Sequence, residues 1–249
     1  MFRGVGTLVN VAAILAGSGI GVLLGHRLPQ RTRDTVTDAL GLVTLLIAAL
    51  SAMSVTDPAL AAATGASAPV LIVLFALVLG GLIGSLLQLE RRLEGFGDLL
   101  RRRLGGGSAE SEAGRQRFIE GFVTSSLVFC VGPLTVLGSL SDGLGNGAEQ
   151  LILKSVLDGF AAIAFAASLG WGVAASAAVV LLVQGSLTLL GALLGSFVPE
   201  AHLLAVTATG GVLLAGVGLR LLAVKAVPVG DLLPALLVAP LLVQVVLLG

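Results

Sequence analysis

The sequence predicts an all-α, polytopic membrane protein with about eight transmembrane helices, some of them related by an inverted repeat. Its composition is 56% hydrophobic and only 11% charged, and the mean hydropathy is +1.07, more apolar than a soluble core accommodates. The apolar residues form eight long stretches, and the basic residues fall mostly in alternate gaps between them. No stretch alternates apolar and polar residues as membrane strands do.

Each stretch is long enough for one span, since a helix rises about 1.5 Å per residue and needs roughly 20 residues to cross about 30 Å of hydrocarbon. The predicted spans run approximately from Gly4 to Leu24, Val36 to Val55, Pro69 to Leu87, Phe118 to Leu140, Gln150 to Leu169, Val173 to Phe197, His202 to Leu222 and Asp231 to Leu248. A cleaved secretory signal is the alternative for the first stretch, but its apolar run exceeds the usual length of about 7 to 15 residues. We expect a single membrane domain over residues 1–249, divided into three spans (1–88), a cytoplasmic linker (89–117) and five spans (118–249).

The basic residues predict the orientation, because positive charge near span ends resists translocation. With eight spans, one side of the membrane receives twelve of the fourteen lysines and arginines, and the other side receives only Arg3. The remaining one, Lys154, lies inside the fifth stretch. Both termini are therefore predicted outside, with the basic loops in the cytoplasm.

An internal similarity predicts the inverted repeat. When the chain is shifted by 170 residues, eight positions between Gly21 and Gly41 are identical to their counterparts between Gly191 and Gly211. Five spans separate the two copies, so they would cross the bilayer in opposite directions. Inverted repeats are common in secondary transporters, although duplicated membrane proteins without transport activity also exist.

Lys154 and Asp158 are the first candidate site residues, because they lie four residues apart on one face of the fifth span. A lone charge at that depth costs from about 3 to more than 10 kcal/mol, so we expect the pair to face the protein interior. It either borders a polar pathway or acts as a structural clip in which Lys154 neutralises Asp158.

The fourth span contains the next candidates, Ser125 and Ser126 followed by Gly132 and Pro133. Proline lacks the amide proton that would bond to the carbonyl of Phe129, and its ring crowds the preceding turn. We therefore predict a kinked or broken helix. Its freed carbonyls would bind a cation or a donor group if they face a cavity, and a simple structural kink is the alternative.

Two amides complete the candidates within the spans. Asn10 lies in the first span and Gln184 in the sixth, each among apolar residues. They either coordinate a polar solute or form hydrogen bonds between helices.

Small residues recur at helical spacing in two spans, where they predict close helix packing. They are Gly17, Gly21 and Gly25 in the first span and Ala76, Gly80 and Gly84 in the third. Packing within the chain is the favoured interpretation, and a homodimer is the alternative.

Several function classes find no support in the sequence. The zero net charge implies no nucleic-acid partner. The two histidines fall at opposite membrane faces, and no serine or cysteine has a histidine partner, so we expect no enzyme. We also expect no cofactor and no metal site, because no ligand cluster is present. Cys130 is the only cysteine and excludes an intrachain disulfide.

Four strings resemble the bacterial membrane-protein family called domain of unknown function 554. They are GTLVN at Gly6 to Asn10, EGFVTSSLVFCVGP at Glu120 to Pro133, KSVLDG at Lys154 to Gly159 and LLPAL at Leu232 to Leu236. The resemblance covers the whole chain and implies several spans in the inner membrane, without an established activity. Asp231 departs from it, since we expect Asn there, and becomes a candidate that would alter the charge preference of a site.

Together these features favour a secondary transporter or facilitator that moves a small polar solute or a monovalent ion across the bacterial inner membrane. An ion channel and a non-transporting scaffold are the alternatives. Beyond the solute, the lipid bilayer is the partner that the sequence implies.

Overall fold

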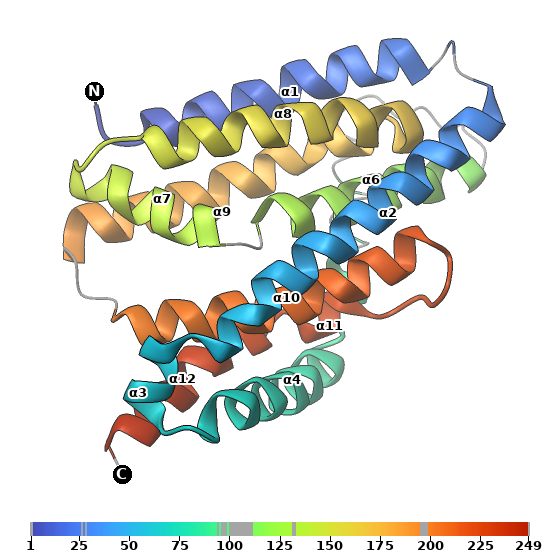
Figure 1. The fold of residues 1–249 in the computed structure, drawn as a ribbon. Helices are drawn as coiled ribbons and strands as arrows, with labels where there is room; N and C mark the ends of the chain where they lie inside the picture. The colour runs from blue at the N-terminus through green and yellow to red at the C-terminus, as the bar shows by residue number, and fades with distance from the viewer. Residues whose placement is uncertain are drawn as a thin grey trace. The chain divides into compact units, whose positions relative to one another are not determined.

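The computed structural model describes residues 2–25, 27, 29–93, 95, 99, 112–130, 133–194 and 199–248. The described residues form helices and connecting turns without a strand (Figure 1). Seven of their helices are long and apolar enough to cross a membrane, and a bent helix pair raises the number to eight if it makes up one span. The predicted all-α membrane class is confirmed.

The chain forms two compact units, and each combines segments from both halves of the sequence. Unit 1 contains Met1–Leu40, Leu93–Cys130 and Leu134–Ser196, and unit 2 contains Gly41–Arg92, Val131–Pro133 and Phe197–Gly249. The helix α2 (Gln30–Ala52) contributes its first half to unit 1 and its second half to unit 2. The first three spans therefore do not form a body separate from the last five.

The other helices divide between the two units. Those of unit 1 are α1 (Val5–Gly25), α6 (Glu112–Cys130), α7 (Pro133–Leu144), α8 (Glu149–Leu169) and α9 (Gly172–Leu194). Those of unit 2 are η1 (Met53–Thr56), α3 (Pro58–Thr64), α4 (Ala68–Leu87), α10 (Glu200–Leu221), α11 (Val229–Leu232) and α12 (Ala235–Leu248).

Unit 1 is organised around a glycine seam between α1 and α8, which lie side by side in Figure 1. A Cβ atom at Gly17 would overlap the carbonyl oxygen of Gly159, and one at Gly25 would overlap that of Ala167. Only glycine lets the two backbones approach this closely. These contacts also show that α1 and α8 run in the same direction. The predicted seam therefore packs within the chain.

Unit 2 contains the corresponding seam between α4 and the last two helices. A Cβ at Gly80 would overlap the backbone of Ala235, and one at Gly84 would overlap the carbonyl of Asp231. Residue numbers rise along α4 as they fall along its partners, so α4 and α12 are antiparallel. The second predicted seam also serves internal packing.

The helix directions within each unit fit a chain that alternates across a membrane. Thr7, near the start of α1, contacts Thr188, near the end of α9, so these helices are antiparallel. Gly218 of α10 packs on Leu45 of α2, and in the contacts between these two helices residue numbers rise along one as they fall along the other. These helices are therefore antiparallel as well. The predicted inverted repeat pairs α1 with α9 and α2 with α10, and it requires the helices of each pair to run in opposite directions. They do so, and the repeat itself stays a prediction.

The fourth predicted span, Phe118 to Leu140, is interrupted, in agreement with the predicted kinked or broken helix. The chain forms two helices there, α6 and α7, which meet at 75°. Helix α6 begins at Glu112, inside the predicted linker, because a helix continues past the apolar segment that marks a span. For the same reason α2 begins at Gln30 rather than Val36. Much of the linker, with residues 100–111, lies outside the described residues.

Candidate functional site

Lys154 and Asp158 lie on one face of α8, with Asp158 near the middle of the helix. Asp158 follows Glu149, the first residue of α8, by nine positions, about 13 Å along the axis. The Nζ of Lys154 donates to Oδ2 of Asp158 at 2.5 Å, and the two side chains are only 8% and 9% exposed. Each charge thus offsets much of the cost of burying the other. The predicted contact between them is present.

Asn10 of α1 joins the same carboxylate. Its Nδ2 donates to Oδ2 of Asp158 at 2.9 Å, and its side chain is fully buried. The glycine seam makes this bond possible, since it holds α1 against α8 for several turns beyond Asn10. Asn10, Lys154 and Asp158 form what we call the charge cluster. The structure therefore brings together three of the predicted residues from two helices.

The end of α6 and the middle of α7 both contact α8, the helix that contains Asp158. Near the end of α6, Phe129 makes an edge-to-face contact with Phe165 of α8, with ring centroids 6.2 Å apart. On α7, Gly138 packs against the side chain of Leu151. Asp158 is midway between Leu151 and Phe165 along α8. The buried carboxylate therefore lies between the levels at which α6 and α7 contact α8.

The carbonyl of Phe129 is not left without a donor, contrary to the simplest prediction. Pro133 begins α7, where its missing N–H costs nothing, and the hydroxyl of Thr135 donates to the Phe129 carbonyl at 3.1 Å. A carbonyl oxygen has two lone pairs, so this one still has a position for a second donor. Gly132 lies outside the described residues.

Gln184 of α9 is fully buried, and neither atom of its amide has a hydrogen-bond partner among the described residues. It precedes Thr188 by one turn, and the Thr188 hydroxyl lies 3.4 Å from that of Thr7. Asn10 follows Thr7 by nearly one turn. Because α1 and α9 are antiparallel, Gln184 and Asn10 lie at a similar depth.

Ser125 and Ser126, near the end of α6, are buried with no hydrogen-bond partner. They belong to a wider set of buried polar atoms in unit 1 for which the described residues offer no partner. The set is the oxygen Oδ1 of Asn10, the hydroxyls of Ser18, Ser125, Ser126 and Ser139, both amide atoms of Gln184, and Nε of Arg33. A dry environment would cost about 1 to 3 kcal/mol for each such group.

Asp231 belongs to a different cluster, in unit 2. Its Oδ1 accepts from the backbone N–H of Glu90 at 2.9 Å, while Glu90 accepts from the N–H of Gly230 at 2.5 Å. Arg220 donates to the Glu90 carboxylate at 2.5 Å. We call Glu90, Arg220, Gly230 and Asp231 the helix-end cluster. Asp231 is thus used in holding helix ends together and is not part of the charge cluster.

The sequence alone does not point to Asp142, which the structure places at the start of α1. Its carboxylate accepts from the N–H groups of Gly4 and Gly6 at 3.2 and 3.0 Å, at the start of α1, and the residue is 3% exposed. A carboxylate at this position satisfies orphan donors and interacts well with the helix dipole. The sequence signal was weak, because Asp142 precedes a glycine-rich turn and resembles an ordinary loop residue.

No three His, Cys, Asp or Glu side chains gather into a possible metal site within the described ranges. The site in unit 1 is instead a buried lysine, a carboxylate and amides, set between long apolar helices. The fold and this site define a helical membrane protein with charged groups buried inside its spans.

Residues 5–244 match the family described as "Protein of unknown function (DUF554)", and the chain belongs to this family. It is 31% identical over 240 residues to "Uncharacterized protein YqgA" of Escherichia coli strain K12, covering 94% of each chain. It is 29% identical over 241 residues to "Uncharacterized membrane protein YdfK" of Bacillus subtilis strain 168, covering 97% of this chain and 96% of that one. No solved structure matches.

Proposed function

We propose that this protein is a secondary transporter or facilitator of a small polar solute or monovalent ion, and that the charge cluster lines its pathway. One observation carries the proposal: a carboxylate deep in a span binds Lys154 and Asn10, between the levels at which α6 and α7 contact the same helix. Broken helices with polar groups near mid-membrane are the usual form of solute sites in such transporters.

The contact between Lys154 and Asp158 represents the closed arrangement of the pathway. A cation or proton that binds Asp158 competes with the ammonium group for Oδ2, and so releases Lys154. The freed ammonium group then meets an anionic group or moves toward the unpartnered oxygens of Asn10 and Gln184. Binding at one residue of the pair is thereby coupled to movement of the other.

The buried polar atoms of unit 1 support the same interpretation. Hydroxyls and amides without a partner among the described residues are costly in a sealed apolar bundle, and they lie on four helices of unit 1, α1, α6, α7 and α9. Water or a polar solute would satisfy them. A purely structural clip requires Lys154 and Asp158 alone and gives no reason for the others.

The proposal is tested with the purified full chain. A thermal-stability screen against ions, amino acids and small organic acids first finds a ligand, since binding to the folded state raises stability by mass action. Flux of that ligand is then measured in proteoliposomes for wild type, Asp158→Asn and the control Asp38→Asn, whose carboxyl is exposed on α2. We expect Asp158→Asn to abolish flux and the control to retain it. Wild-type flux from folded Asp158→Asn would refute the assignment, and the pair would then be a structural clip.

We also propose the bacterial inner membrane as the location, with both termini outside. The charge distribution supports this, as does the alternation of helix directions within each unit. In a Cys130→Ser background, cysteine at the exposed position Asn146 should react with an impermeant thiol reagent in intact cells, or in spheroplasts if an outer membrane is present. Cysteine at the exposed Arg31 should react only after the inner membrane is permeabilised. The reverse pattern would invert the topology.

A further inference from the structure

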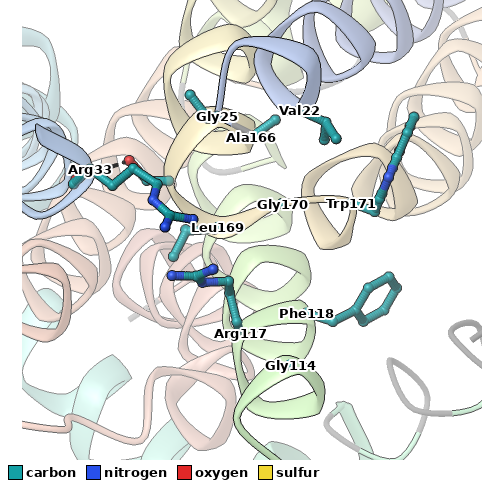
Figure 2. A pocket seen from close by; sticks show the side chains of 12 residues that line it. Val22, Gly25, Arg33, Gly114, Arg117, Phe118, Ala166, Leu169, Gly170 and Trp171 are labelled. Carbon is teal, nitrogen blue, oxygen red and sulfur yellow. Dashed lines mark hydrogen bonds between the residues drawn. The ribbon is translucent and has the colours of Figure 1, made fainter. Parts of the chain in front are cut away.

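Unit 1 contains a pocket of about 210 Å³ where α1 and α8 end and α9 begins. Its lining includes Arg33 of α2, Arg117 and Phe118 of α6, Leu169 of α8 and Trp171. Figure 2 shows the guanidinium groups of Arg33 and Arg117 near each other beside Leu169, with the rings of Phe118 and Trp171 on the opposite side of the view. The pocket is far larger than the roughly 10 to 15 Å³ that one water needs.

Among the described residues, the lining of this pocket contains two arginines and no carboxylate. No carboxylate of the described chain forms an ion pair with either guanidinium. The Nε of Arg33 is buried and has no hydrogen-bond partner. The backbone of Arg33 is fixed, since its carbonyl accepts from the hydroxyl of Ser168 at 3.2 Å. A paired set of planar guanidinium donors suits the oxygens of a phosphate group.

The position of the pocket identifies the source of that phosphate. It lies at the ends of three apolar helices long enough to span the membrane, on the side that the charge distribution assigns to the cytoplasm. Trp171 at its rim is 57% exposed, and tryptophan is enriched at the level of lipid headgroups. Basic pockets between helices on the cytoplasmic side are suited to anionic headgroups.

We propose that Arg33 and Arg117 bind a phosphate group, and that this phosphate belongs to an anionic phospholipid of the cytoplasmic leaflet. Phe118 and Trp171 then contact the glycerol and upper acyl region. This site is separate from the charge cluster, and it gives the protein a dependence on lipid composition that the proposed transport activity does not require.

The test uses the full chain in nanodiscs of phosphatidylcholine alone or of equal parts phosphatidylcholine and phosphatidylglycerol. Thermal unfolding and native mass spectrometry are measured for wild type, Arg33→Gln, Arg117→Gln and the control Arg31→Gln, an exposed arginine outside the pocket. A third arm adds inorganic phosphate to the phosphatidylcholine discs. We expect phosphatidylglycerol to raise the unfolding temperature of wild type and Arg31→Gln. We also expect both proteins to retain this lipid in native mass spectrometry. We expect Arg33→Gln and Arg117→Gln to bind it about fivefold or more weakly.

Three results would overturn the proposal. One is equal retention of both lipids by the wild-type protein. This result is measured without any variant, so it does not depend on whether a variant folds. Another is a stability loss in Arg33→Gln and Arg117→Gln that is the same in both discs, which would mean that the arginines only neutralise the carbonyl end of α8. The last is an equal stabilisation by inorganic phosphate, which would leave phosphate recognition standing and overturn the lipid as its source.

Discussion

The two units each contain a network built on a carboxylate and a base, but the networks differ in where they lie along their helices. The charge cluster of unit 1 is deep inside α8, and the helix-end cluster of unit 2 is at the ends of α10 and α11. In the helix-end cluster, Glu90 accepts from Arg220 and from a backbone N–H, and Asp231 accepts from another. These carboxylates therefore have a complete structural explanation.

The charge cluster lacks such an explanation. Oδ2 of Asp158 accepts from both Lys154 and Asn10, while Oδ1 of Asn10 and both amide atoms of the nearby Gln184 have no partner. A network at helix ends saturates donors that any helix must satisfy. A network inside a span satisfies nothing that the backbone requires, and this difference is why we place the proposed pathway at the charge cluster. The following predictions test whether depth in the span makes this difference.

The largest effect is expected from Lys154→Met, which leaves the carboxylate of Asp158 buried without its cation. Breaking a buried pair by removing one partner costs about 3 to 5 kcal/mol. We expect a loss of that order in the free energy of unfolding, measured by SDS-induced unfolding in bicelles. The double variant Lys154→Met with Asp158→Leu should recover most of it, because no lone charge remains. A single variant as stable as wild type would show that water already reaches Asp158.

The second largest effect is expected from Gly17→Leu in the glycine seam. Its side chain would collide with Gly159 and Ala162 of α8 and separate Asn10 from Asp158. Overpacking of this kind costs about 1 to 3 kcal/mol. Gly19→Leu on the same helix is the matched control, since a Cβ there meets no atom within 4 Å, and it should unfold like wild type. Equal stability of the two variants would contradict the close packing of α1 on α8 at Gly17.

The seams and the charge cluster illustrate what the sequence could predict. Spacing alone placed Gly17, Gly21 and Gly25 on one face, and the same periodicity aligned Lys154 with Asp158. Asn10 was singled out as a polar residue in an apolar helix, but its partner was not predictable, since 148 residues separate it from Asp158. Contacts of that separation depend on helix pairing, which one sequence does not specify.

Residues at helix ends were predicted least well, for a related reason. Asp231 was selected because it departs from an expected family pattern, yet its carboxylate caps a backbone N–H at Glu90. Asp142 was not selected, although it accepts from two N–H groups of the chain near Gly4. Capping at a distance leaves no periodic signal, because the capped helix start and the carboxylate lie far apart in sequence.

A smaller effect is expected in unit 2 from Glu90→Gln. The variant loses the charge that pairs with Arg220 but keeps an amide oxygen that can accept from Gly230. Because the Arg220 and Glu90 side chains are 21% and 15% exposed, we expect a loss of only about 1 kcal/mol in the free energy of unfolding. Ligand flux per folded molecule should be unchanged. Flux that falls as it does in Asp158→Asn would remove the distinction between the two clusters.

The smallest effect is expected from Asp142→Asn. This variant tests whether the effect on flux depends on the depth of a carboxylate in its span or on its location in unit 1. Asp142 belongs to unit 1 with the charge cluster, but it lies at a helix end, as Glu90 does. Its charge at the start of α1 should contribute about 0.3 to 1 kcal/mol, so the unfolding midpoint should shift slightly and flux should persist. Loss of flux would mean that unit 1 as a whole is sensitive to lost charge. Retained flux would locate the function in the buried stretch of α8 that contains Asp158.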